Sequence, residues 1–180
     1  MKGVPVGILF KSAHTRGGFA ENIRIHDITM IGTPVVFRVT MNWNPSYSYA
    51  TIPPDLKTYP AYYKVLAMPV PEGKGIAHFH DVHIWNIKAT GAKTAFEVDA
   101  YKSVSLESFT LDHLEIQAAT AGHINDAKGW YFSVVSLVTA DGSVVALSDD
   151  SNIMGIASRE APAQFKPDSS TKSFTEQNKN

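Results

Sequence analysis

Two adjacent acidic residues near the end of the chain have the residue types that a glycosidase would use. Asp149 and Asp150 follow each other directly. Glycoside hydrolysis needs one carboxylic acid to protonate the leaving oxygen and a second carboxylate to activate water. Strand alternation would point these two side chains to opposite faces, and their surroundings, Leu-Ser-Asp-Asp-Ser-Asn, are typical of a polar turn. We therefore expect a turn here, not a catalytic pair.

The densest group of histidines comprises His78, His80 and His83. On a strand, the first two share a face and the third lies on the opposite one, which is awkward for three ligands around one metal ion. Asp81 also lies off that face. We expect these side chains to face solvent or to form hydrogen bonds between coils, and we predict neither a metal site nor a cofactor. Gly-x-Ser-x-Gly and glycine-rich phosphate motifs are both absent from the sequence.

A pattern of apolar and turn residues in segment 21–39 recurs along the chain. Ile23 and Ile25 alternate with polar neighbours, as in a half-buried strand, and Gly32 provides a turn before Phe37. We expect three short strands joined by tight corners. Adding 59 to each number gives a second copy whose inward and turn positions match in kind, namely Val82, Ile84, Asn86, Ile87, Ala89, Gly91, Phe96 and Val98.

Two further copies follow at steps of 27 and 21 residues. The third contains Phe109, Leu111, His113, Leu114 and Ile116, and the fourth contains Trp130, Phe132, Val134, Val135 and Leu137. Such short repeats without a helical period indicate a solenoid, whose coils bury a core only by stacking on one another. Isolated hairpins would need a tight turn at each connection, and only Asp141-Gly142 offers one.

The sequence therefore predicts an all-β fold, a right-handed parallel β-helix. Ile25, Ile84, Leu111 and Phe132 should form one inward ladder of parallel, in-register strands. His113 occupies the position that Asp27 and Asn86 occupy in other copies. We expect these polar residues to satisfy the backbone at corners.

We divide the chain into β-helical coils over residues 1–156 and a polar tail over residues 157–180. Residues 40–76 interrupt the repeat with six of the ten prolines and five of the seven tyrosines. Because disordered linkers are poor in aromatic residues, we expect an ordered excursion packed against the side of the solenoid. A functional loop and a structural flap both fit this composition.

The overall composition excludes several classes of function. Sixteen Lys and Arg residues against seventeen Asp and Glu residues give a net charge of −1, so we expect no nucleic-acid partner. The lack of cysteine excludes a disulfide framework and a cysteine nucleophile. No apolar run reaches the length of a transmembrane helix, and we expect no membrane partner. The short apolar run near the start contains Pro5, which is more typical of a strand than of a signal peptide.

The first predicted strand, residues 4–12, begins without a cap. Val4, Val6, Ile8 and Phe10 point to one side, and Leu9 and Lys11 point to the other. A terminal solenoid repeat needs a polar cap to protect its open edge. We therefore expect the β-helix to be truncated on its N-terminal side and to self-associate through this uncapped edge.

Three motifs together resemble the polygalacturonase family of pectin-degrading glycoside hydrolases, family 28, of bacterial type. They are Gly7-Ile8-Leu9-Phe10-Lys11, then Arg16-Gly17-Gly18, then Asn22-Ile23, where the family has Gly-x-Arg-Ile-Lys, Arg-Gly-Gly and a strand beginning Asn-Ile. Segments 48–53 and 78–92 are also similar to bacterial members, and the resemblance covers about residues 7–155. It implies a pectin-lyase-like solenoid that acts on galacturonan or a related pectic polysaccharide without a cofactor, in a secreted or periplasmic protein.

The catalytic motifs of this family lie upstream of the matched strand. They are Asn-Thr-Asp, Asp-Asp and Gly-His-Gly, and this chain has only about ten residues before the match. The resemblance therefore implies the C-terminal portion of an inverting hydrolase. We predict that this chain contains no catalytic residue and is inactive alone.

The substrate-binding residues that we expect are Lys11, Arg16, Trp43 and Tyr49. The resemblance assigns to Lys11 a contact with the substrate carboxylate. Leu9 replaces the family's arginine and cannot supply its bidentate contact, so we expect weaker binding or a less charged sugar. The aromatic rings would stack on sugars, with packing against a neighbouring coil as the alternative.

Two other functions remain open. A non-catalytic carbohydrate-binding β-helix would bind oligogalacturonate without turnover. A structural, trimeric β-helix of the phage tail-fibre type would form a stable trimer without affinity for sugars.

Overall fold

The computed structural model describes residues 1–13, 17–41, 52–68, 70–71, 73–101, 106–148 and 151–160. Strands dominate this part of the chain, which confirms the predicted all-β class, and the described residues contain one short helix, α1 (Tyr62–Ala67). The strands are β1 (Val6–Lys11), β2 (Phe19–Ala20), β3 (Ile23–Ile31), β4 (Val35–Thr40), β5 (His78–Asp99), β6 (Leu106–Asn125), β7 (Ala127–Thr139), β8 (Val145–Leu147), β9 (Asn152–Met154) and β10 (Ser158–Glu160).

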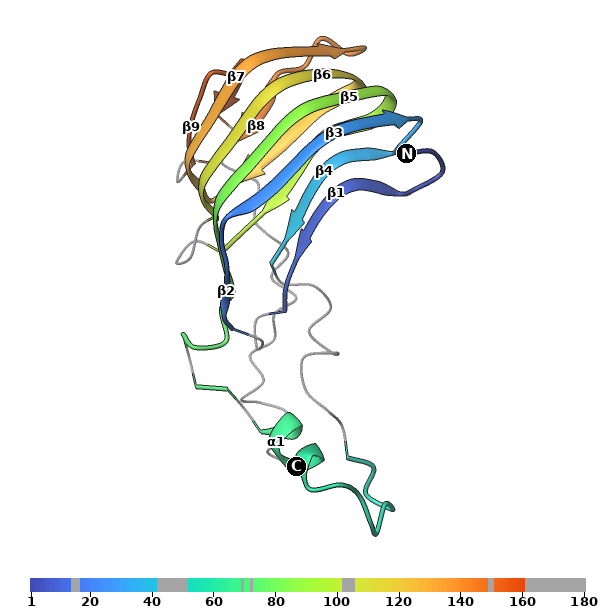
Figure 1. Cartoon of the computed structure of the whole chain (residues 1–180), viewed down its shortest axis with the longest axis vertical. Coiled ribbons are helices and arrows are strands. Elements are labelled where there is room, and N and C mark those ends of the chain that lie inside the picture. Colours follow the sequence, from blue (N-terminus) through green and yellow to red (C-terminus); the bar gives the residue numbers. More distant parts are fainter. Residues whose placement is uncertain are drawn as a thin grey trace.

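The strands form one sheet in which every described pair is parallel. Its main order is β1-β4-β5-β6-β7-β9, with β3 also beside β5 and β8 between β6 and β10. Figure 1 shows β1, β4, β3, β5, β6 and β7 arranged in succession, each bent along its length. β10 falls within the range predicted as a polar tail, so paired strands extend to residue 160.

The strand register confirms the predicted repeat. Ile25 pairs with Ile84, which in turn pairs with Leu111. Leu111 pairs with Phe132 on the next strand. The last three side chains are buried and Ile25 packs against them from a half-buried position. The steps of 59, 27 and 21 residues thus stack equivalent apolar residues directly on one another.

Single residues with positive φ bend the long strands. One column contains Asn22, Asp81, Ser108 and Gly129, and the other contains Asp27, Asn86, His113 and Val134, with φ between 51° and 63°. Asn, Asp and Gly tolerate this left-handed conformation better than other residues. Because one such residue redirects the backbone without ending the pairing, β3 is one continuous strand where we expected two short ones.

The polar residues in the second column bond to side chains, whereas we expected bonds to the turn backbone. Asn86 Nδ2 donates to Asp27 Oδ1 over 2.9 Å. His113 Nδ1 lies 2.7 Å from Asp112 Oδ2. The first contact connects two corners that lie 59 residues apart in the sequence. The second holds a corner residue against its neighbour in the chain.

Aromatic side chains fill the centre of the core. Phe10 contacts Phe109 with ring centroids 5.5 Å apart, and Phe109 stacks on Trp130 at 4.4 Å. Trp130 is fully buried, and its Nε1 donates to the Leu106 carbonyl over 3.0 Å. Pairs at these separations favour offset or edge-to-face packing. The core therefore runs continuously from β1 to β7.

The described residues of the 40–76 segment include α1, which lies away from the sheet in Figure 1. We expected this segment to pack against the side of the sheet, but α1 has no buried residue and Val65 is largely exposed. The chain returns to the sheet where Phe19 of β2 pairs with His78 of β5. No helix in the described ranges is long and apolar enough to span a membrane.

Candidate functional site

Lys11 lies at the end of β1 with its side chain exposed, as strand alternation predicts. Ile8 and Phe10 are buried, and Leu9 on the outer face is 45% exposed. The other three expected substrate-binding residues, Arg16, Trp43 and Tyr49, lie outside the described residues, as do Asp149 and Asp150. The structure thus places one of the four expected side chains, on the outer surface of the sheet.

The outer face beside Lys11 carries several charged residues. Along the sheet Lys11 pairs with Thr40, which pairs with Asp99 of β5 and then with Asn125 of β6. Asp99 accepts a hydrogen bond from Asn125 Nδ2 at 3.0 Å and lies 3.2 Å from His123 Nε2. Two residues before Asp99, Glu97 accepts a 2.8 Å hydrogen bond from Arg38 Nε. We call Lys11, Arg38, Glu97, Asp99, His123 and Asn125 the charged face.

Glu97 and Asp99 are two carboxylates on one side of a strand, but their partners do not suit acid–base chemistry. Partial burial would raise the pKa of Asp99, yet its hydrogen bond and charge interaction with His123 and its bond with Asn125 together lower it. A general acid at neutral pH needs the opposite shift. Glu97 is held in an ion pair with Arg38. This pair of carboxylates therefore fits ionic anchoring of neighbouring strands better than proton transfer.

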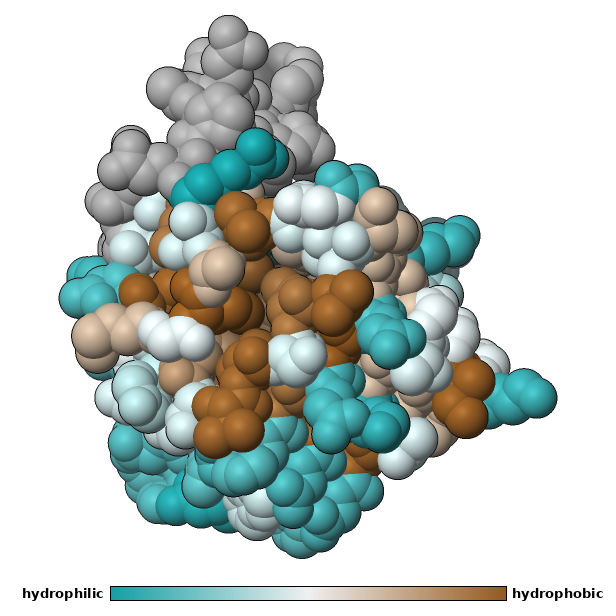
Figure 2. Space-filling model, turned by 90° about the horizontal axis from the view of Figure 1, so that it is seen from above, coloured by the Kyte–Doolittle hydropathy of each residue, from teal (hydrophilic) through white to brown (hydrophobic). Residues whose placement is uncertain are grey.

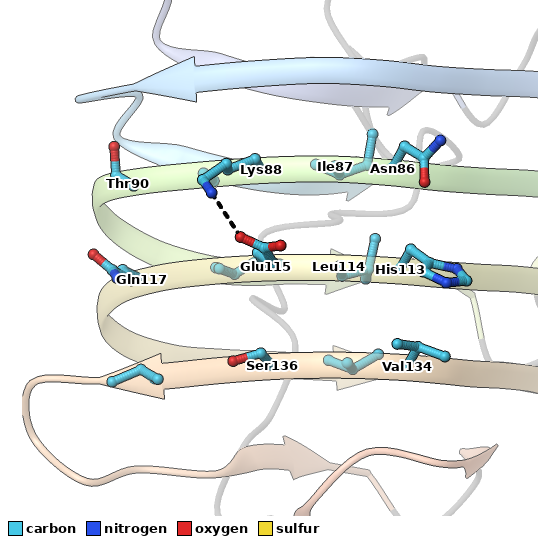
Figure 3. Close-up of a pocket in the computed structure, with 14 residues that line it drawn as sticks. Asn86, Ile87, Lys88, Thr90, His113, Leu114, Glu115, Gln117, Val134 and Ser136 are labelled. Atoms are coloured by element: carbon cyan, nitrogen blue, oxygen red, sulfur yellow. Dashed lines mark ion pairs between the residues drawn. The ribbon is translucent and has the colours of Figure 1, made fainter.

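A groove of about 760 Å³ lies across β5, β6 and β7. On each strand it begins at the residue of the second column of positive φ, namely Asn86, His113 or Val134. Its polar lining comes from outward positions of the three strands, and Figure 3 shows these side chains in rows across the sheet. The middle row contains Lys88, Glu115 and Ser136, which are paired in register. The flanking positions contribute Asn86, Thr90, His113, Gln117, Val134 and Val138.

The formal charges among the described residues that line this groove cancel. Lys88 Nζ lies 2.8 Å from Glu115 Oε2, as the dashed line in Figure 3 marks. The hydrogen bond and the charge interaction between them raise the pKa of Lys88 and lower that of Glu115. Both groups therefore remain ionised around neutral pH, and the rest of the polar lining is amide, hydroxyl and imidazole. The groove offers both donors and acceptors without a net charge.

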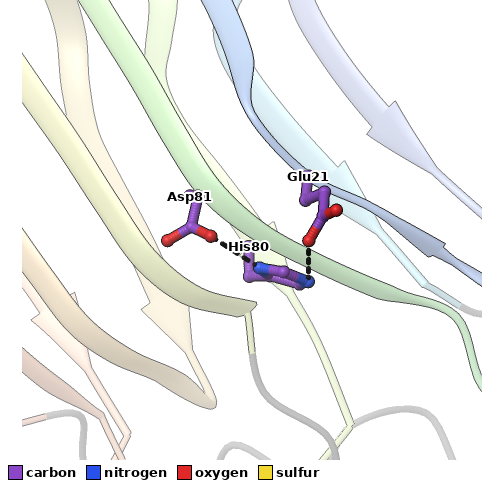
Figure 4. A group of neighbouring side chains, drawn as sticks. All are labelled: Glu21, His80 and Asp81. Atoms are coloured by element: carbon purple, nitrogen blue, oxygen red, sulfur yellow. Dashed lines mark hydrogen bonds and ion pairs between the residues drawn. The ribbon is translucent and has the colours of Figure 1, made fainter.

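The expected histidine group is divided between two sets of contacts. His83 lies against Trp85 with ring centroids 4.5 Å apart, and His26 stacks on the same indole at 4.3 Å. His80 lies between two carboxylates, as Figure 4 shows, with Nδ1 3.0 Å from Asp81 Oδ2 and Nε2 3.4 Å from Glu21 Oε2.

Glu21, His80 and Asp81 offer one ligand atom each, within 4.8 Å of one another. Both ring nitrogens of His80 already face a carboxylate, however, so a metal ion would have to replace one of these contacts. All three side chains are substantially exposed. An imidazole bridging two carboxylates accounts for the arrangement, and we assign no metal to it.

Lys88, Glu115 and Gln117 were not identified as site residues from the sequence. The repeat could have identified them as outward-facing residues, because each lies next to an inward residue of the second or third copy. No protein-family model, no curated protein and no solved structure matches the chain.

Proposed function

We propose that this chain is a carbohydrate-binding portion of a right-handed parallel β-helix of the pectin-lyase-like type, related to the C-terminal part of a polygalacturonase. The in-register parallel ladder from Ile25 to Phe132 supports the solenoid. The sequence motifs around Lys11 and Gly17-Gly18 support the family. The proposed ligand is a pectic polysaccharide or oligosaccharide.

The groove across β5, β6 and β7 carries the proposal of carbohydrate binding. Sugar hydroxyls both donate and accept hydrogen bonds, and Gln117, His113 and Ser136 can do the same. Val134 and Val138 place apolar surface beside these groups for the C–H faces of a sugar. A binding site generally combines apolar surface with a few polar groups that fix the orientation of the ligand.

The paired charges indicate which pectic chain the groove would take. Lys88 is neutralised by Glu115 at 2.8 Å, so a bare uronate carboxylate would have to compete with an existing ion pair. A methyl-esterified or neutral sugar carries no such charge. We therefore propose that the groove binds chains of low charge, while Lys11 on the charged face meets a remaining uronate carboxylate as a point charge.

We also propose that this chain binds without hydrolysing its ligand. Inverting hydrolysis needs two carboxyl groups, one protonated and one ionised, with room for a water molecule between them. On the charged face Glu97 is held in an ion pair with Arg38, and the partners of Asp99 lower its pKa, which favours the ionised form of Asp99.

Calorimetric titration of the full chain with oligogalacturonides, unesterified and methyl-esterified, tests this proposal. The esterified ligand should bind at least as well as the unesterified one. Gln117→Ala should weaken binding by about 2- to 10-fold, the effect of one lost neutral hydrogen bond. Lys128→Ala is the matched control, because Lys128 is exposed on β7 but does not line the groove.

Two results would contradict this assignment. Binding of the unesterified ligand alone, lost in Lys11→Ala and unaffected by Gln117→Ala, would move the site to the charged face. Failure of both ligands to bind would reject carbohydrate binding and favour the structural alternative.

A further inference from the structure

The two sides of the groove differ in polarity. On the β7 side Val134 and Val138 are 64% and 59% exposed. Figure 2, which views the molecule from the β7 end, shows apolar residues gathered on this surface. Apolar side chains cover the ligand but do not fix its orientation, which depends on a few polar groups. Most of the hydrogen bonds that orient a sugar therefore come from β5 and β6.

Two polar residues lie side by side at the end of the groove where β5 and β6 bend. Asn86 and His113 both line the groove, and both have positive φ, 53° and 51°. Directly after them Ile87 pairs with Leu114. The two residues are therefore on adjacent paired strands, whose backbones lie about 4.7–4.9 Å apart. We call Asn86 and His113 the corner pair.

A carboxylate outside the groove lining holds the amide of Asn86. Asn86 Nδ2 donates a 2.9 Å hydrogen bond to Asp27 Oδ1. The hydrogen bond with His26 and then the one from Asn86 lower the pKa of Asp27, so this group is ionised around neutral pH and can only accept. The amide nitrogen must therefore face Asp27. Figure 3 shows the amide oxygen of Asn86 turned toward the strand that carries His113, so Asn86 presents an acceptor to the groove.

A second carboxylate outside the groove lining holds the imidazole of His113. His113 Nδ1 lies 2.7 Å from Oδ2 of Asp112, and this hydrogen bond is the main cause that lowers the pKa of Asp112. Because the ionised carboxylate only accepts, the neutral imidazole carries its proton on Nδ1 and keeps a lone pair on Nε2. Nε2 bonds to no residue in the described part of the chain, and the side chain is 58% exposed. Asp112 thus makes His113 an acceptor as well.

We propose that the corner pair recognises two neighbouring hydroxyl groups of the bound sugar, with both hydroxyls donating. This inference rests on the proposed function, the binding of a pectic chain of low charge in the groove. Hydroxyls on adjacent ring carbons can reach acceptors on two adjacent strands, and the corner pair supplies these acceptors. Asp27 and Asp112 are positioning residues, because they act on the ligand only through Asn86 and His113.

Two acceptors give the groove a selectivity that an uncharged lining alone would not give. O-acetylation of a ring hydroxyl removes its proton, so the ligand then offers acceptors to the acceptors of the corner pair. A polar group that loses both water and its partner costs more than a contact that is merely absent. Methyl esterification alters the carboxyl group and leaves the ring hydroxyls intact. We therefore expect the groove to tolerate methyl esters and to reject O-acetylated sugars.

Calorimetric titration of the full chain with two methyl-esterified oligogalacturonides, one with free ring hydroxyls and one O-acetylated, tests this selectivity. O-acetylation should weaken binding by about 5- to 30-fold. Equal binding of the two ligands would overturn the corner-pair proposal and leave carbohydrate binding intact. Failure of both to bind would reject the proposed function, and this inference with it.

Asp112→Asn tests the positioning role, because an amide at this position can donate to Nδ1 and move the imidazole proton to Nε2. Nitrogen-15 NMR above the range in which imidazoles titrate reports which ring nitrogen carries the proton, and His113→Gln assigns the resonances. The proton should be on Nδ1 in the natural chain and on Nε2 in the variant. Binding of the ligand with free hydroxyls should fall by about 5- to 10-fold, while binding of the O-acetylated ligand should not fall.

Asp81→Asn is the matched control. His80 Nδ1 lies 3.0 Å from Asp81 Oδ2, the same kind of contact, and neither residue lines the groove. This variant should keep the selectivity of the natural chain. A proton on Nε2 of His113 in the natural chain would overturn the proposal even if Asp112→Asn did not fold. So would a proton that moves in Asp112→Asn without any change in selectivity.

Discussion

The side-chain amide of Asn86 donates a 2.9 Å hydrogen bond to Asp27, which occupies the equivalent corner 59 positions earlier. Both residues have positive φ, 53° and 57°. The pKa of Asp27 is lowered by its hydrogen bond from His26 and then by the one from Asn86. One pair of side chains thus connects two bends that the 40–76 segment separates in sequence.

Two substitutions of Asn86 should distinguish the stability contributed by its hydrogen bond from the stability that depends on its backbone conformation. Asn86→Gly removes the bond but tolerates positive φ, so it should cost about 1 kcal/mol of unfolding free energy. Asn86→Ala also incurs the penalty of a left-handed conformation and should cost about 2 kcal/mol. Urea unfolding gives both values. Equal costs would mean that the conformation at this corner contributes nothing.

Val134 is a β-branched residue with φ of 51°, in the column otherwise occupied by Asp27, Asn86 and His113. This conformation is a genuine outlier for valine. Val134→Asn should therefore stabilise the fold by about 1 kcal/mol. The measurement is urea unfolding of the variant and of the natural chain. Destabilisation would show that the exposed valine makes contacts worth more than the strain.

Acid should weaken the contact among Asp99, His123 and Asn125. The pKa of Asp99 is lowered in the folded state by these partners, so the contact stabilises the fold above the unfolded pKa of about 4 and is lost as the pH falls through the lower, folded value. Because the side chain is about half exposed, the effect should not exceed about 1 kcal/mol. Urea unfolding of Asp99→Asn should show a smaller loss of stability in acid.

Asp55→Asn provides the control for this pH dependence, because Asp55 is exposed and lies outside the sheet. Its acid profile should follow that of the natural chain. An unchanged profile in Asp99→Asn would mean that the charged face does not contribute to acid sensitivity.

The purified chain should release no reducing sugar from polygalacturonate or from methyl-esterified pectin. Hydrolysis needs one protonated carboxyl group, whereas the pKa of Asp99 is lowered by its partners and Glu97 is held in an ion pair with Arg38. A standard reducing-end assay at several pH values checks this. Turnover that disappears in Glu97→Gln or Asp99→Asn would assign catalysis to this pair and would contradict the proposal of binding alone.

The sequence predicted the ladder of apolar residues because burial enforces a strict spacing in a parallel stack. Phe37 pairs with Phe96, and Gly32 and Gly91 both have positive φ. Burial or positive φ restricts each of these positions to one type of residue, so the 59-residue repeat could be recognised in the sequence. The outward positions have no such restriction. Lys88 and Glu115 could not be recognised as neighbours in a groove until the register and the bends were known.

The turn at Gly155 was also beyond prediction from the sequence. The fourth repeat has inward residues like those of the others, and its valines suggested an ordinary coil. A Cβ at Gly155 would collide with the Phe132 carbonyl, and no periodic pattern records such a local contact between segments. Association through the N-terminal strand stays a prediction.

The unequal steps between stacked strands have a consequence for how the chain folds. Pairing Ile25 with Ile84 closes a loop of 59 residues, whereas pairing Leu111 with Phe132 closes only 21. The longer closure costs about 0.9 kcal/mol more in chain entropy. Assembly should therefore begin between β6 and β7 and proceed toward β1. During synthesis β1 and β4 emerge first and can pair with each other, as Val6 does with Val35, but this pair joins the rest of the sheet only after β5 follows.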